Sequence, residues 1–227
     1  MDRILEPEIM DDHDADAAYA RADFADSNQA FADRLAGELE AGSGIRATPQ
    51  VVDLGCGPAD VTIRIARRVP RGHVVGVDGA AEMLALAHAA VKSAGLADRI
   101  ALHLGRVPGL DLPKHGFDAV VSKDMLHHLP DPHVLWSEIA RLARPGAIVQ
   151  VMDLIRPTSP LEAREIVERV AAREHPLLKE DFYNSLCAAF TIEEVRAQLR
   201  AAGLALGVER AGDRHLIVRG ECSTSRR

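Results

Sequence analysis

The sequence predicts an α/β fold in which seven strands form one doubly wound sheet, mostly parallel, with an antiparallel hairpin at its C-terminal end. Two observations predict it. Five short apolar runs alternate with segments of helical periodicity, and such βαβ units build parallel sheets because their crossovers are right-handed. After these units, residues 204–220 indicate two further strands joined by a glycine-containing turn, which we expect to pair at one edge of the sheet.

The five central strands are expected where β-branched and other apolar residues run together between turn signals. Helices are expected between them, and capping boxes begin two of the later ones. We expect the polar segment 174–190 to be less regular than the helices on either side of it. The expected strands are 50–54, 73–77, 99–104, 117–122 and 147–155, and the expected helices are 59–68, 80–94, 131–143, 159–173 and 191–203.

A chain of 227 residues is expected to form one domain with additions. Residues 1–47 form an N-terminal arm with helices that cap the domain. Residues 48–220 form the main domain, with a cap insertion after the fifth strand at about 155–190. Residues 221–227 are expected to be a disordered tail.

Charge and cysteine content narrow the range of partners and compartments. A net charge of −7 makes nucleic acid an unfavoured partner, and no apolar run reaches the length of a membrane span. Cys56, Cys187 and Cys222 are widely spaced and odd in number, which favours a reducing compartment over a disulfide framework. The acidic N-terminus does not resemble a signal peptide. We therefore expect a cytoplasmic protein, and the sequence leaves a homodimer open.

The first expected strand ends in a glycine pair, Gly55 and Gly57, which lets the backbone approach a ligand closely. A tight turn without a ligand is the alternative. The third glycine of a dinucleotide fingerprint is replaced by Asp60, which disfavours a pyrophosphate. Asp78, at the end of the second strand, is well placed to accept from a ribose diol. A cofactor with adenosine but no pyrophosphate fits both observations, and S-adenosylmethionine is such a cofactor.

Five motifs in order resemble those of the class I S-adenosylmethionine-dependent methyltransferases, most closely their small-molecule branch. They are DLGCG, VDGAAEML, FDAVVS, LHHLPDP and RLARPGAIVQVMDL, and together they cover about residues 48–155. The resemblance implies a Rossmann-like fold, which agrees with the expected terminal strand pair. It also implies S-adenosyl-L-methionine as cofactor and S-adenosyl-L-homocysteine as product.

The resemblance implies contacts with the methionine part of the cofactor after the first and fourth strands. The loop backbone at Gly55, Cys56 and Gly57 would pass beside it. Asp53 would anchor that loop or bind the amino group. Ser122, at the end of the fourth strand, would line the sulfonium end.

On the adenosine side the resemblance implies Asp78 as the ribose ligand, followed by Gly79 where the family often has serine. Met83 would lie near the adenine or belong to the helix core. The family often has Gly-Asp-Ala after the third strand, but this chain has Arg106-Val107 after its glycine, and arginine cannot accept a hydrogen bond. Three alternatives stay open: backbone groups bind the adenine, Arg106 stacks on it, or Asp111 replaces the missing aspartate.

The segment VSKDMLHHLPDP follows the fourth strand and is therefore expected beside the transferred methyl group. Methyl transfer needs alignment, and it needs a base only when the acceptor carries a proton near neutral pH. Three hypotheses compete. His127 is a general base or orients the acceptor; Asp124, His127 and His128 bind a divalent ion; or the histidines only hold the loop. We favour His127 as the catalytic residue and no metal.

Side chains expected at the acceptor are Tyr19, Asp124, His128 and Asn184, from the N-terminal cap, the fourth-strand loop and the insertion. The predicted function is methyl transfer to a small-molecule acceptor. RNA or protein methylation is one alternative. A nicotinamide-dependent reductase or a non-catalytic binding module on the same fold is an alternative of another class.

Overall fold

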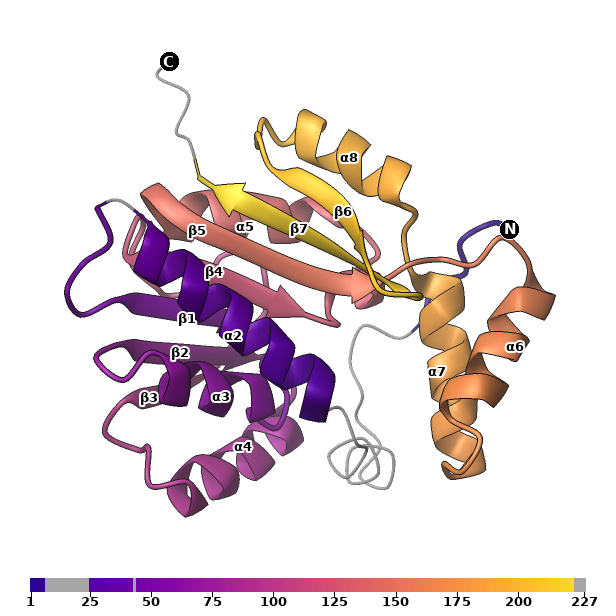
Figure 1. Ribbon diagram of the computed structural model, residues 1–227, viewed down its shortest axis with the longest axis horizontal. Coiled ribbons are helices and arrows are strands. Elements are labelled where there is room, and N and C mark those ends of the chain that lie inside the picture. The colour runs from indigo at the N-terminus through magenta and orange to yellow at the C-terminus, as the bar shows by residue number, and fades with distance from the viewer. Residues whose placement is uncertain (7–24, 43, 223–227) are drawn as a thin grey trace.

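The structure is a computed structural model, and it describes residues 1–6, 25–42 and 44–222. Its strands form one sheet in the order β3-β2-β1-β4-β5-β7-β6 (Figure 1). The five strands β1 to β5 run parallel to one another, while β7 is antiparallel to both β5 and β6. This confirms the predicted fold class. The strands are β1 Gln50–Leu54, β2 His73–Asp78, β3 Ile100–Leu104, β4 Phe117–Lys123, β5 Ala143–Leu154, β6 Gly207–Ala211 and β7 His215–Glu221.

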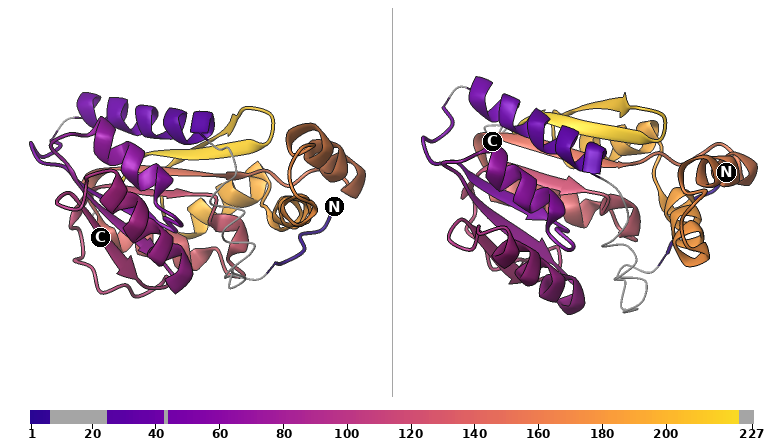
Figure 2. Two further views of the ribbon diagram at one scale, coloured as in Figure 1. Left: turned by 90° about the horizontal axis from the view of Figure 1, so that it is seen from below. Right: turned by 60° about the horizontal axis from the view of Figure 1, so that its bottom comes forward.

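Helices cover both faces of the sheet, because alternate residues of each buried strand point to opposite sides. Val51 of β1 packs with α2 (Ala25–Ala41), α3 (Asp60–Arg68) and α4 (Ala81–Ser93). Val52 points the other way and packs with α5 (His133–Leu142) and α8 (Ile192–Ala201). The turned views show α2, α3 and α4 together on one side of the sheet (Figure 2).

The chain after β5 forms two helices, α6 (Pro160–Val170) and α7 (Pro176–Ala188), which pack together around a small apolar cluster. The expectation of a less regular stretch at 174–190 is therefore wrong, because a 13-residue helix occupies most of it. Only the end of α7 is buried, at Leu186, Cys187 and Ala188, so the segment lacks the continuous apolar stripe that identifies a helix from sequence. Packing against α6 stabilises the helix instead.

The parallel register brings the carboxyl ends of the central strands to one edge of the sheet. Leu54 of β1 pairs with Val77 of β2 on one side and with Ser122 of β4 on the other. The loops after these three strands therefore begin side by side, at the place where open α/β sheets bind their ligands. Among the helices that the structure describes, none is long and apolar enough to cross a membrane.

Candidate cofactor and methyl-transfer site

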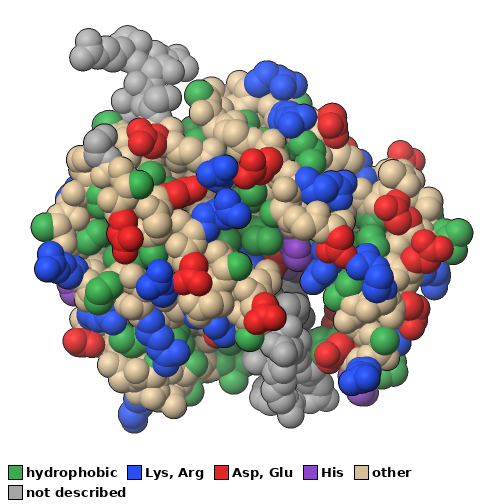
Figure 3. Space-filling model, viewed as in Figure 1, with side chains coloured by type: hydrophobic (Ala, Val, Ile, Leu, Met, Phe, Trp, Pro, Cys, Tyr) green, Lys and Arg blue, Asp and Glu red, His purple; other side chains and the backbone are tan. Residues whose placement is uncertain are grey.

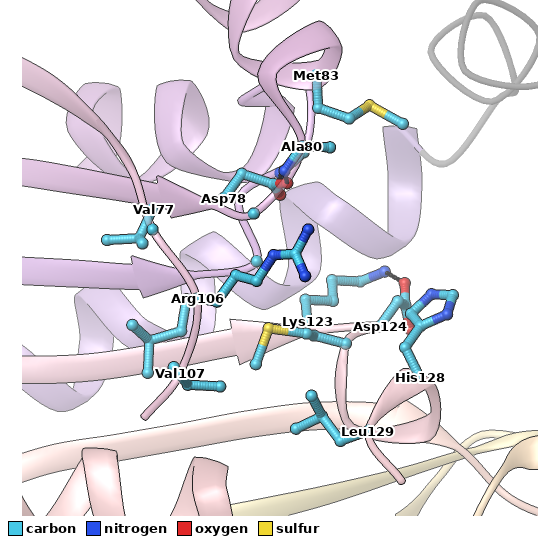
Figure 4. A pocket seen from close by; sticks show the side chains of 16 residues that line it. Val77, Asp78, Ala80, Met83, Arg106, Val107, Lys123, Asp124, His128 and Leu129 are labelled. Carbon is cyan, nitrogen blue, oxygen red and sulfur yellow. Dashed lines mark hydrogen bonds and ion pairs between the residues drawn. The ribbon is translucent and has the colours of Figure 1, made fainter. Parts of the chain in front are cut away.

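A pocket opens at this carboxyl edge, and the loops after β1, β2, β3 and β4 all contribute to its wall (Figure 4). The β4 loop includes the short 3₁₀ helix η1 (Leu126–His128). The residues that line the pocket are Leu54, Gly55, Gly57, Val77, Asp78, Gly79, Ala80, Met83, Gly105, Arg106, Val107, Lys123, Asp124, Met125, His128 and Leu129.

Both glycines after β1 are needed, for different reasons. Gly55 has φ +75°, and a Cβ there would lie 2.6 Å from Met125 Sδ, so the β4 loop leaves no room for a side chain. Gly57 has φ +50°, and a Cβ there would meet no atom within 4 Å. Because Gly57 lines the pocket, its bare face leaves space for a ligand. The buried Cys56 is not among the lining residues, and burial raises the pKa of its thiol, so it offers only backbone.

Asp78 joins the two loops that follow β1 and β2. Its Oδ2 accepts from the amide of Gly57 at 2.8 Å, and its Oδ1 accepts from the amide of Ala80 at 2.9 Å. A carboxylate oxygen has two lone pairs, so both oxygens can accept again. The carboxylate is thus held still at the pocket wall, with capacity left for the two hydroxyls of a ribose.

Asp53 and Ser122 lie behind the pocket wall. Asp53 is 1% exposed and accepts from Thr62 Oγ1 at 2.6 Å, which ties β1 to α3. Burial raises the pKa of Asp53 to about 6. Ser122 is fully buried, and its hydroxyl donates to the carbonyl of Leu54 at 2.8 Å. The expectation that Ser122 lines the sulfonium end does not fit, because its hydroxyl is used between strands; Asp53 is placed to anchor the loop.

The side of the pocket where the sequence predicts the adenosine is formed by α4 and the loop after β3. Met83 reaches the wall from the first turn of α4, and Val107 is half-buried against the core. The side chain of Arg106 covers Gly79, since a Cβ on that glycine would lie 3.1 Å from Arg106 Cγ. Figure 4 shows the guanidinium extending into the pocket. Asp111 is not among the lining residues, so it does not replace the missing aspartate.

The loop after β4 places an ion pair at the other end of the pocket. Lys123 and Asp124 both line it, and Lys123 Nζ bonds to Asp124 Oδ2 (Figure 4). Asp124 has φ +56°, a conformation that is costly for a residue other than glycine and that often marks a functional site. Burial opposes ionisation of Asp124, but Lys123 and the nearby His215 hold its pKa below the usual range. Asp124 is therefore a fixed anion in the pocket.

The two histidines of η1 differ from expectation. His127 is 3% exposed and does not line the pocket. Its Nδ1 lies 2.6 Å from Asp153 Oδ1, and its Nε2 lies 3.5 Å from Glu6 Oε1. Burial would lower the pKa of His127, but these carboxylates outweigh it and raise the pKa to about 9. His127 as general base is therefore not supported, because both of its ring nitrogens face carboxylates. His128 is the histidine that lines the pocket.

Glu6 reaches these histidines because residues 1–6 are bound to α7 and the β4 loop. The Arg3 guanidinium donates to the carbonyls of His127 and Leu129 at 2.8 and 2.9 Å and covers the Phe190 ring at 3.9 Å. The Ile4 amide donates to the carbonyl of Cys187 at 3.1 Å. The N-terminal segment is thus part of this site.

A family model described as a methyltransferase domain matches residues 51–146. The 27-O-demethylrifamycin SV methyltransferase of Amycolatopsis mediterranei is 29% identical over 76% of this chain and 58% of its own length. The demethylmenaquinone methyltransferase of Lactiplantibacillus plantarum is 37% identical over 49% of this chain and 47% of its own. A SAM-dependent methyltransferase from Aquifex aeolicus has the same fold, with TM-score 0.69, 19% identity and coverage of 94% of this chain and 100% of its own.

Residues 51–146 thus form a methyltransferase domain, and the chain has the fold of a SAM-dependent methyltransferase. The chain covers less than two thirds of the length of these two curated relatives. The predicted family is confirmed, and with it S-adenosylmethionine as the cofactor. The matched region contains the glycine loop, Asp78 and the β4 loop, which are the parts of the pocket described above.

The pocket contains only part of the predicted acceptor set. Asp124 and His128 line it, whereas Asn184 is exposed on α7 and is not among the lining residues. Tyr19 lies outside the described residues. Sequence reasoning missed Lys123, although it stands in the segment already singled out. It also missed Glu6, which carried no signal because it lies in an acidic, aperiodic arm.

Proposed function

We propose that the protein transfers the methyl group of S-adenosylmethionine to a small-molecule acceptor. One observation carries the proposal most directly: the hydrogen bond from Gly57 to Asp78 sets a bare glycine face beside a fixed carboxylate in one pocket. The glycine face suits the close approach of a ligand, and the carboxylate suits a ribose diol. The lack of a third glycine at Asp60 argues against a dinucleotide.

Bound S-adenosylmethionine supplies an electrophilic methyl group on a sulfonium centre. In our proposal the backbone of 55–57 lies along the methionine part, and Asp78 accepts from the ribose. Met83, Gly79 and the Arg106–Val107 segment enclose the adenine. For the adenine we favour backbone groups with Arg106 stacked on the ring, because the Arg106 side chain already extends into the pocket.

The acceptor is proposed to enter beside Lys123, Asp124 and His128. These residues hold and orient it, and the apolar Met125 and Leu129 exclude water from the same end of the pocket. The ionised Asp124 can accept a hydrogen bond from an N–H or O–H of the acceptor, which aims the nucleophile. Alignment is thus the main catalytic contribution of the chain, and His127 acts from behind the pocket wall.

A small acceptor is favoured over a nucleic acid by the charge of the molecule. The net charge is −7, and Figure 3 shows Lys and Arg side chains interspersed with Asp and Glu over the visible face. A protein that binds a phosphate backbone needs a concentrated basic surface.

The test is to incubate the protein and S-adenosylmethionine carrying a labelled methyl group, in parallel, with a metabolite extract, with total RNA and with total protein. Label is expected in the small-molecule fraction, and an Asp78→Ala variant is expected to transfer at least tenfold less at low cofactor concentration. Label that appears only in RNA or protein would contradict the proposed acceptor class. Binding of NADH without binding of S-adenosylhomocysteine would contradict the proposed activity altogether.

A further inference from the structure

Three side chains meet at the junction of the N-terminal segment and η1. Glu6 Oε1 lies 3.5 Å from His127 Nε2 and 2.9 Å from His128 Nδ1, and all three potential ligand atoms lie within 4.8 Å of one another. Ligands of a tetrahedral zinc ion at bond lengths of about 2.0–2.1 Å stand about 3.3 Å from each other. The two distances from Glu6 lie on either side of that value.

Asp153 fixes the orientation of the His127 ring. Its Nδ1 bonds to Asp153 Oδ1, and this carboxylate also accepts from the backbone amides of Leu126 and Leu154, both at 2.7 Å. Nε2 is therefore the nitrogen turned toward Glu6. A carboxylate behind the second ring nitrogen is the usual arrangement of a metal-binding histidine, because it sets both the tautomer and the ring position.

His128 supplies an independent observation. Its Nδ1 is buried and has no hydrogen-bond partner among the described residues, since its contact with Glu6 is close but not aligned as a hydrogen bond. Buried polar atoms in native proteins nearly always have a partner, so an orphaned nitrogen points to a ligand. This nitrogen faces the same carboxylate oxygen as Nε2 of His127.

We propose that Glu6, His127 and His128 bind one divalent transition-metal ion of the zinc class. Two imidazoles and one carboxylate suit Zn²⁺ or Co²⁺, whereas Mg²⁺ prefers oxygen ligands. Three protein ligands leave a fourth position open. Since His128 lines the transfer pocket, that position lies at its edge.

This site differs from the metal alternative raised by the sequence, which used Asp124. That carboxylate is held by Lys123 and is not part of the cluster. Glu6 takes its place, and it is brought there by the contacts of Arg3 and by Ser185, whose hydroxyl lies 3.3 Å from Glu6 Oε1. A bound ion would therefore also fix the N-terminal segment to the β4 loop.

The test uses the full chain without a histidine tag, stripped of metal with chelator and titrated with Co²⁺. One equivalent is expected to bind, with the strong visible absorption of four-coordinate Co²⁺, and Zn²⁺ is expected to displace it. Glu6→Gln and His128→Ala are expected to weaken binding at least tenfold. The matched control His133→Ala, an exposed histidine on α5, is expected to bind like the wild type.

Three results would overturn the proposal: no stoichiometric Co²⁺ or Zn²⁺ binding, a thiolate charge-transfer band that assigns the ion to a cysteine, or unchanged binding by Glu6→Gln. Circular dichroism of each variant confirms that it is folded. A rise in the melting temperature on adding Zn²⁺, present in the wild type and absent in Glu6→Gln, is a second readout. None of these measurements uses the methyl donor, so the metal site can fail while the proposed activity stands.

Discussion

Gly57→Ala separates the backbone role of this glycine from its role in the pocket. Position 57 has φ +50°, and an alanine in the left-handed region costs about 1–2 kcal/mol of folding free energy. The added Cβ meets no protein atom within 4 Å, so no further loss of stability is expected. It would, however, occupy the space proposed for the methionine part of the cofactor.

The chain offers a matched control. Gly95, just after α4, has φ +67°, has no atom within 4 Å of an added Cβ and does not line the pocket. Urea denaturation should show a similar loss of stability for Gly57→Ala and Gly95→Ala. Calorimetry should show at least a tenfold loss of S-adenosylhomocysteine affinity, about 1.4 kcal/mol, for Gly57→Ala alone. Equal affinity in both variants and the wild type would refute the placement of the cofactor along this loop.

Three further predictions concern carboxylates. Asp78→Ala should weaken S-adenosylhomocysteine binding at least tenfold in calorimetry, whereas Asp111→Ala should not. The pKa of Asp53 is raised from 3.8 to about 6 in the folded state, which therefore binds this proton more tightly than the unfolded state. The free energy of unfolding should thus fall by about 3 kcal/mol as the pH rises from about 3.8 to about 6. Urea denaturation at several pH values should show that Asp53→Asn removes this dependence. The same dependence of the unfolding free energy on pH in the variant and the wild type would contradict the prediction. Asp124→Asn should lower kcat while the Kd for the cofactor stays unchanged. A fall in kcat together with an equal fall in cofactor affinity would place Asp124 at the cofactor instead.

Much of the fold was predictable because its signals are local. Strand and helix patterns alternate along the chain, and the register of a parallel sheet then brings Gly57 and Asp78 to the same edge. Helix α7 was not predictable, because its stability comes from packing against α6 rather than from its own pattern.

The sequence predicted the position of the β4 loop at the pocket, but not the orientation of its side chains. The sequence places two histidines after β4, but it does not say which ring faces the pocket. That depends on Asp153, 26 residues away from His127, and on Glu6, 121 residues before it. Such contacts exist only in the folded chain. The sequence likewise predicts Ser122 at the sulfonium end of the ligand, although its hydroxyl donates to the carbonyl of Leu54 in the neighbouring strand.

The most direct test of the account is a calorimetric titration of the wild-type protein with S-adenosylhomocysteine. The pocket at the carboxyl edge predicts one binding site per chain, with NADH unable to compete. No binding of S-adenosylhomocysteine, or its displacement by NADH, would contradict the assignment of this pocket to the methyl donor.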